Sequence, residues 1–187
     1  MNVRPDVRMD KTQFFRWLER QERRCELVRG RAVVLPFVTR NHARISYNVA
    51  TALGRRLDDA RFSISIGDFA VETGDQSVRY ADVMVEPFSA EGGARSTADA
   101  LLLVEVLSSS TMHVDFGEKR EEYLSLPALG TYFICAQDEA RVWVWTRREG
   151  RWPDDPDILE GLDAGAPVPV LDLTLPLAEL YRNVSVR

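Results

Sequence analysis

The alternation of apolar and polar positions divides the chain into short segments, and the most apolar of these lies near the middle. Residues 101–107, LLLVEVL, are interrupted by a single acid, Glu105. So short and apolar a run is typical of a central strand buried on both faces, and Ser108-Ser109-Ser110-Thr111 then ends it. An unpaired carboxylate there would cost on the order of several kcal/mol, so we expect Glu105 to be paired, protonated or bound to a metal.

A helix is predicted directly after this strand. Asp115 is the expected N-cap residue, with Glu118 three positions later as in a capping box, and Pro127 ends the helix. Lys119 and Tyr123 are four residues apart and therefore share one face of it. The pattern thus predicts a buried acid at a strand end and a lysine near the start of the next helix.

Helical spacing of apolar residues predicts two earlier helices, over residues 12–22 and 40–60, the first capped by Asp10 or Thr12. Period-two and β-branched runs predict a hairpin over 25–35 that turns at Arg29-Gly30. The remaining predicted elements are a strand over 62–72 with a bulge at Gly67-Asp68, its partner over 78–86, a loop over 87–98, strands over 131–136 and 141–146, a surface loop over 150–170, a strand over 171–175 and a helix over 177–181.

Length and composition indicate an ordinary globular protein. The chain has 187 residues, of which 45% are hydrophobic and 28% charged, which suits one domain over residues 12–187 after a loose arm of residues 1–11. No apolar run approaches the roughly 18 residues that span a bilayer, and the N-terminus lacks the apolar stretch of a signal peptide. A cytoplasmic location is expected, with Cys25 and Cys135 as isolated core residues.

The net charge is −5 and the isoelectric point is near 5.2. This argues against a protein that coats nucleic acid non-specifically. It is compatible with a nucleic-acid enzyme, because a metal-binding cleft needs acids and a local basic patch can hold phosphate. Eight arginines gather in residues 16–44, where a solvated helix face explains them as well as a binding surface does.

Four polar residues lie within or beside apolar runs: Glu26, Asp82, Glu105 and Lys119. Asp82 precedes Val83-Met84-Val85, and its strand and that of Glu105 flank one loop, so we expect the two strands to be neighbours. Two carboxylates on adjacent strands offer the oxygen ligands that Mg²⁺ prefers, and such an ion activates water and stabilises charge on phosphorus. A nearby lysine would orient or deprotonate that water, or hold the phosphate. A buried salt bridge with an arginine explains either acid taken alone.

Five segments together resemble a known family: residues 26–30 (ELVRG), His42, residues 81–85 (ADVMV), residues 104–111 (VEVLSSST) and residues 115–123 (DFGEKREEY). On these segments the chain is similar to the Uma-type restriction endonucleases, a bacterial group of the PD-(D/E)XK nuclease superfamily, and the resemblance covers roughly residues 12–182. The resemblance implies an α+β fold: a mixed β-sheet flanked by helices, with a restriction-endonuclease-like αβββαβ core after an N-terminal helix and hairpin.

The resemblance also implies Mg²⁺-dependent hydrolysis of phosphodiester bonds, with Mn²⁺ as a substitute, DNA as the expected polymer and a homodimer as the expected assembly. Asp82 and Glu105 are implied as metal ligands, with the backbone carbonyl of Val106 as a third. Lys119 is implied as the catalytic lysine. The superfamily usually places it two residues after the second acid, where this chain has Leu107, and the Uma-type group supplies it from the following helix.

Further positions resemble the outer part of the family's site. Glu26 corresponds to an additional N-terminal acid that reaches the metal through water, and His42 and Tyr123 are candidate accessory residues. Three positions depart from the family pattern: Ala81 replaces the usual proline, Arg31 stands where an acid is common, and Thr131 stands where glutamate is common. None of these departures removes a predicted metal ligand.

Other functions remain open from the sequence. The main alternative is a non-catalytic binding or assembly protein that keeps the nuclease fold. Ser108–Thr111 with His113 and Asp115 would suggest a serine hydrolase, but the chain has no GxSxG elbow. The two histidines lack the neighbours of a zinc site, and the Trp143/Trp145 strand is more typical of a core than of a base-stacking platform.

Overall fold

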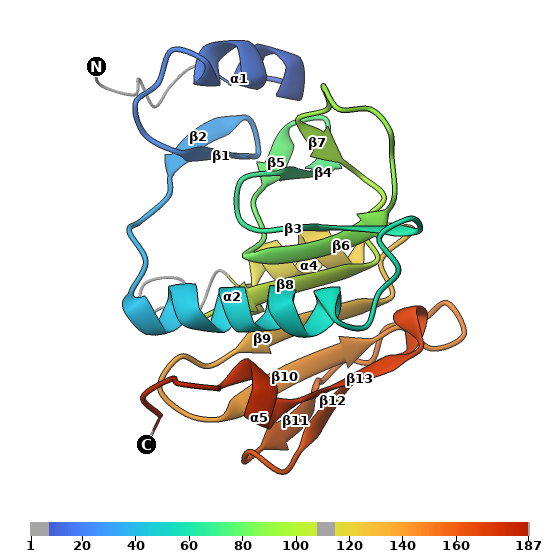
Figure 1. Cartoon of the computed structure of the whole chain (residues 1–187). Coiled ribbons are helices and arrows are strands. Elements are labelled where there is room, and N and C mark those ends of the chain that lie inside the picture. The colour runs from blue at the N-terminus through green and yellow to red at the C-terminus, as the bar shows by residue number, and fades with distance from the viewer. Residues whose placement is uncertain (1–7, 108–114, 187) are drawn as a thin grey trace.

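The computed structural model describes residues 8–107 and 115–186, which form two large β-sheets with helices packed against them (Figure 1). The helices of this part are α1 (Lys11–Leu18), α2 (Arg40–Gly54), α4 (Glu118–Leu124) and α5 (Leu177–Leu180), with a short 3₁₀ turn at Pro169–Leu171. None of them is long and apolar enough to cross a membrane.

The larger sheet has six strands in the order β11-β10-β9-β8-β6-β3. Their bounds are β3 Phe62–Ser65, β6 Val83–Pro87, β8 Leu102–Val106, β9 Thr131–Cys135, β10 Arg141–Thr146 and β11 Asp157–Glu160. Strands β8 and β9 pair in parallel and every other neighbouring pair is antiparallel, so the sheet is mixed. The predicted apolar strand is therefore β8, at the centre of the sheet, and all five of its residues are buried.

Helices cover both faces of this sheet because side chains alternate along each strand. One core contains alternate residues of β6 and β8 with the apolar side of α2, α5 and the small sheet of β12 (Gly165–Val168) and β13 (Leu173–Pro176). The other core contains the intervening strand residues with Tyr123 of α4. Figure 1 shows α2 across one face and α4 behind the other.

The second large sheet lies toward the N-terminus, with α1 beside it (Figure 1). Its strand order is β2-β1-β5-β4-β7, with bounds β1 Cys25–Val28, β2 Arg31–Val34, β4 Ala70–Gly74, β5 Ser77–Arg79 and β7 Ser96–Thr97. The predicted hairpin turn is confirmed at Arg29 and Gly30, which have φ values of 48° and 81°. Asp10 caps α1 through the backbone N–H of Gln13, and the N–H of Met9 donates to the Gly30 carbonyl at 2.8 Å.

The α+β fold class is confirmed, and α2, β3, β6, β8, α4 and β9 follow one another in the αβββαβ order of the predicted core. Two predicted strands were wrong in extent. Residues 62–72 form β3 and β4, and residues 78–86 form β5 and β6, each pair divided between the two sheets. The chain changes sheet at residues 66–69 and 80–82, so β4 and β5 are an insertion that pairs with the N-terminal hairpin.

Smaller predictions also need correction. The second helix ends at Gly54 rather than near residue 60, and residues 150–170 contain β11 and β12 as well as loop. Asp115 is not the N-cap residue of α4, because the helix begins after Gly117, which makes no side-chain capping bond. The serine, threonine and histidine of the alternative hydrolase lie in residues 108–114, outside the described residues.

Candidate active site

The centre of the candidate site is Glu105 on β8. Its neighbours Leu103 and Val104 join different cores, and Glu105 points to the same face as Leu103, toward α4. There Lys119 Nζ lies 2.8 Å from Glu105 Oε1, and the Tyr123 hydroxyl donates to the same oxygen at 2.9 Å. Lys119 and Tyr123 are both buried, on the shared helix face that the sequence predicts. The acid of the central strand is thus held by two donors from the next helix.

Asp82 lies in the short segment between β5 and β6, where the chain passes from one sheet to the other. Its Oδ2 atom accepts a hydrogen bond from the backbone N–H of Val106 at 2.7 Å, which fixes the carboxylate beside the end of β8. His42 Nε2 lies 3.1 Å from the same oxygen. The first turn of α2, capped by the Thr39 hydroxyl, delivers this histidine.

The N-terminal sheet contributes Glu26 from β1. Its Oε1 atom accepts from the backbone N–H of Tyr80 at 3.0 Å and lies 3.4 Å from Lys119 Nζ, while its Oε2 accepts from Arg79 at 3.2 Å. Arg79 is 1% exposed and also donates through two nitrogens to Glu122 of α4, at 2.7 and 2.8 Å. A buried charge network therefore joins both sheets and α4 around the lysine.

Burial and neighbouring charges shift the pKa values of these groups. Burial raises the pKa of Glu105 well above its ordinary value, and Asp82 and Asp115 add to that effect while Lys119 opposes it. Burial by itself would lower the pKa of Lys119, but the surrounding carboxylates, Glu105 first, outweigh burial and raise it well above its ordinary value. Burial likewise opposes ionisation of Glu26, yet Lys119 and Arg79 leave its pKa below the ordinary value.

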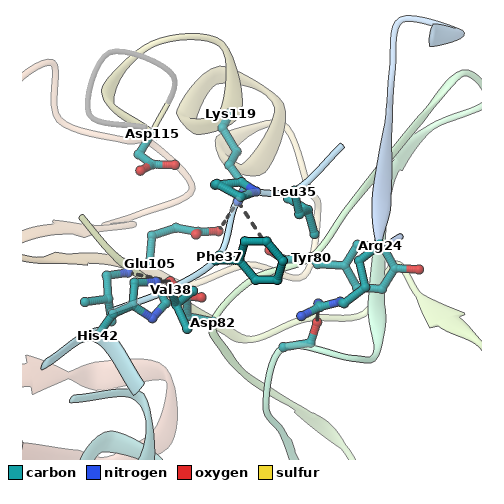
Figure 2. A pocket seen from close by; sticks show the side chains of 13 residues that line it. Arg24, Leu35, Phe37, Val38, His42, Tyr80, Asp82, Glu105, Asp115 and Lys119 are labelled. Atoms are coloured by element: carbon teal, nitrogen blue, oxygen red, sulfur yellow. Dashed lines mark hydrogen bonds and ion pairs between the residues drawn. The ribbon is translucent and has the colours of Figure 1, made fainter. Parts of the chain in front are cut away.

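A small cleft of about 80 Å³, open to solvent, exposes this arrangement (Figure 2). Asp82, Glu105, Val106, His42 and Lys119 all line it. Glu26 and Tyr123 are not among its lining residues and lie behind Lys119 and Glu105, which they contact. The structure thus brings all the predicted site residues together in two layers, one that faces the cleft and one that supports it.

Sequence reasoning missed several lining residues. Asp115, interpreted only as a helix cap, is 2% exposed and lines the cleft beside Lys119. Its position four residues before Lys119 was the available signal. Tyr80, Arg24 and Phe37 also line the cleft, and the sequence carried no pattern that assigned them to it. The Trp143/Trp145 strand lies elsewhere, with Trp145 buried against Tyr132 and Trp143 packed on Phe116.

The donor set fits a hard cation better than a soft one. Among the described residues, no group of three or more His, Cys, Asp or Glu side chains has the arrangement of a metal site. Structural zinc takes three or four such side chains, whereas Mg²⁺ binds through one or two carboxylates and keeps several waters. Asp82 and Glu105 both line the cleft, so their two carboxylates match the second requirement.

Comparison with known proteins decides the family. The profile of the Uma2 family, described as "Putative restriction endonuclease", matches residues 12–178, which is most of the chain. The chain belongs to the Uma2 family. The resemblance seen in the sequence is therefore confirmed, and the segments that carried it include the residues that meet in the cleft.

Two uncharacterised proteins of Synechocystis sp. are relatives of this Uma2 protein. One is 27% identical over 128 residues, which cover 65% of this chain and 72% of the relative. The other is 26% identical over 152 residues, which cover 79% of this chain and 80% of the relative. A crystal structure from Anabaena variabilis, described as a "putative nuclease belonging to DUF820", has a TM-score of 0.75 at 16% identity over 92% of this chain and 97% of that one. That likeness shows a shared nuclease-like fold.

Proposed function

We propose that this Uma2 protein is a divalent-metal-dependent endonuclease that hydrolyses phosphodiester bonds of nucleic acid, with DNA as the polymer and Mg²⁺ as the ion. One observation carries the proposal: Asp82 and Glu105 lie beside each other at the end of β8, in an open cleft, with Lys119 Nζ 2.8 Å from Glu105. An acid pair with an adjacent lysine is what metal-assisted attack of water on phosphorus requires.

In this proposal Asp82 and Glu105 hold the metal ion. The carbonyl of Val106 would be a third ligand, because the N–H and C=O of one strand residue project to the same edge and this N–H already points to Asp82. The bound ion would lower the pKa of a coordinated water and stabilise charge on the phosphate. His42 orients Asp82 from the other side.

Lys119 and its partners supply the rest of the chemistry. The ammonium of Lys119 is fixed by Glu105, Glu26 and the Tyr80 carbonyl, the last at 3.3 Å, so its position is set before substrate arrives. From there it would orient the attacking water or contact a non-bridging phosphate oxygen. Water would then form the new bond to phosphorus and lose one proton to solvent, while the bond to the leaving sugar oxygen breaks and a proton from solvent neutralises that oxygen.

Metal binding is the first test. Calorimetry with Mg²⁺ and Mn²⁺ should show binding to the wild type that the isosteric variant Asp82→Asn/Glu105→Gln loses. The matched control is Asp59→Asn/Glu91→Gln, which removes the same two charges from exposed positions away from the cleft and should bind metal normally. Metal binding that survives in the site variant would contradict the assignment of these ligands.

Cleavage is the second test. Labelled DNA and RNA, each single- and double-stranded, are the substrates to compare. The wild type should cut DNA, only when Mg²⁺ or Mn²⁺ is present, and Lys119→Met should abolish the cutting. Metal binding with no cleavage of any of these polymers would instead favour the non-catalytic alternative. A homodimer belongs to the same proposal, because cutting both strands of a duplex needs two sites. Light scattering should then give twice the mass of the 21.2 kDa chain.

A further inference from the structure

The segment that joins β2 to α2 presents an exposed aromatic side chain at the cleft. Phe37 is 95% exposed, and the next residue, Val38, is exposed as well. Single exposed apolar residues are ordinary on protein surfaces. Phe37 and Val38 differ in position, since they line the same cleft as Asp82 and Glu105 (Figure 2). Pro36 fixes one backbone dihedral just before them, which limits the entropy that a ligand must remove.

Two arginines that form no ion pair among the described residues follow this aromatic side chain in the sequence. Arg40 and Arg44 are exposed and four residues apart on α2, so they project from one side of the helix, and the 56% exposed Tyr47 follows one turn later. Within the described residues, neither arginine forms an ion pair with a carboxylate. We call Phe37, Arg40, Arg44 and Tyr47 the α2 rim.

The arginines on the opposite side of the cleft already form ion pairs with carboxylates. There Arg24 lies 3.3 Å from Asp68, and Arg95, in the adjoining hollow, lies 2.6 Å from Glu19. These arginines are already paired, so a polyanion gains less from them than from the α2 rim. On a chain with net charge −5, Arg40 and Arg44 thus offer phosphates two cations on the exposed face of α2. This face lies away from the buried His42 side of the helix, and a strand that leaves the cleft past Phe37 would reach it.

We propose that the α2 rim binds a single, unpaired nucleic-acid strand, with Phe37 stacked on a base next to the scissile phosphate and Arg40 and Arg44 on the flanking phosphates. The bases of a duplex are stacked on both faces, so an aromatic ring finds a free face only on an unpaired strand, a frayed end or a gap. Four helical residues rise about 6 Å, which is on the scale of one extended nucleotide. The inference rests on the proposed nuclease function and narrows its substrate to single-stranded DNA or to single-stranded regions in a duplex.

The test is fluorescence anisotropy with one labelled DNA oligonucleotide, used as a single strand and as a blunt duplex, with Ca²⁺ in place of Mg²⁺ so that binding is measured without cutting. Phe37→Ala should weaken single-strand binding roughly five- to hundred-fold, the range for loss of one base–aromatic stack, and leave duplex binding unchanged. Phe37→Trp should retain binding. Phe88→Ala, which removes a 55% exposed phenylalanine outside the cleft, is the matched control.

Arg40 and Arg44 are tested separately, through the salt dependence of binding. Arg40→Gln/Arg44→Gln should reduce the salt dependence of single-strand binding, with the slope of log K against log salt falling by roughly 0.7 for each lost phosphate contact. Arg55→Gln/Arg61→Gln removes the same charge from the far end of α2 and beyond, and should leave the slope unchanged. Because all these side chains are exposed, the melting temperature should stay constant throughout.

The outcomes separate this inference from the function on which it rests. If Phe37→Ala binds both forms of DNA as the wild type does, or weakens both equally, the rim proposal is wrong even where Mg²⁺-dependent cleavage depends on Asp82 and Glu105. If single-strand binding depends on Phe37 but no metal supports cleavage, the rim proposal stands and the nuclease function falls. A wild type that binds no DNA overturns both.

Discussion

At the scale of single residues, the most consequential side chain is Lys119, an ammonium buried between Glu105 and Glu26. Lys119→Met leaves the two carboxylates without their shared cation, and removing one partner of a buried pair costs about 3–5 kcal/mol. Urea denaturation should show this loss in the free energy of unfolding. Lys11→Met, which breaks the partly exposed pair with Glu72, should cost about 1 kcal/mol or less. Equal losses in the two variants would contradict the central role of the buried lysine.

Tyr123 tests how far the second layer of the site controls the first. Its hydroxyl donates to Glu105 Oε1 at 2.9 Å inside the protein, so Tyr123→Phe removes one of the two donors to that oxygen without opening a cavity, and Lys119 remains as the other. We expect metal affinity to fall roughly 10- to 100-fold, as for other residues that orient metal ligands. Calorimetry with Mn²⁺ measures this directly. Tyr181→Phe removes a buried hydroxyl bonded to the Ala136 and Arg141 carbonyls, and should leave metal affinity unchanged.

The sequence predicted the site better where the signal was local. Glu105 was identifiable because an acid stood in an apolar run, and Lys119 because the helix followed within a few residues. Arg79 gave no such signal, because its partners Glu26 and Glu122 are 53 and 43 residues away in sequence. A pairing at that separation depends on how the sheets pack, which no periodicity in one segment records.

At the scale of elements, β-strand periodicity predicted strand positions but not sheet membership. Residues 62–72 were predicted as one strand with a bulge at Gly67-Asp68, yet β3 pairs with β6 and β4 pairs with β5 and β7. The alternation of side chains is the same in either sheet, so only the bend at Gly67, where φ is 64°, marks the change. The consequence is functional, since the matching break between β5 and β6 brings Asp82 beside Val106.

The start of β9 gives an element-scale prediction. A Cβ atom on Gly130 would lie 2.6 Å from Cβ of Val170, on the 3₁₀ turn, which is too close for real atoms. Gly130→Ala should therefore destabilise the protein by about 1–3 kcal/mol, as overpacking does. Thermal unfolding of Gly130→Ala/Val170→Gly should recover part of that loss, because Val170→Gly removes the Cβ atom at 2.6 Å together with the branch atoms at 2.8 and 3.0 Å. Without such recovery, contact with Val170 is not the reason for the glycine.

At the scale of the whole molecule, the two large sheets have unequal cores. The six-stranded sheet is packed on both faces by the two larger clusters of buried side chains. The N-terminal sheet relies on a smaller cluster of Phe14, Cys25, Leu27, Ala70 and Val78. Because apolar burial is the main source of stability, the N-terminal sheet should open at lower free energy than the central sheet. Glu26 lies on the less stable of the two sheets, so its place beside Lys119 depends on what ties the sheets together.

Arg79 is the residue that connects the N-terminal sheet to the rest of the molecule, and its removal tests that connection. It is buried, extends from the N-terminal sheet and donates to Glu122 of α4 through two nitrogens, so Arg79→Met leaves both Glu122 and Glu26 without their partner. Hydrogen exchange should then accelerate in β1, β4 and β5 while β8 and β9 stay protected. Arg56→Met removes a similar two-nitrogen contact, to Glu179 near the surface, and should leave exchange in the N-terminal sheet unchanged. Faster exchange spread evenly over both sheets would mean that the molecule opens as one cooperative unit. Arg79 would then contribute to global stability and not specifically to the contact between the two sheets.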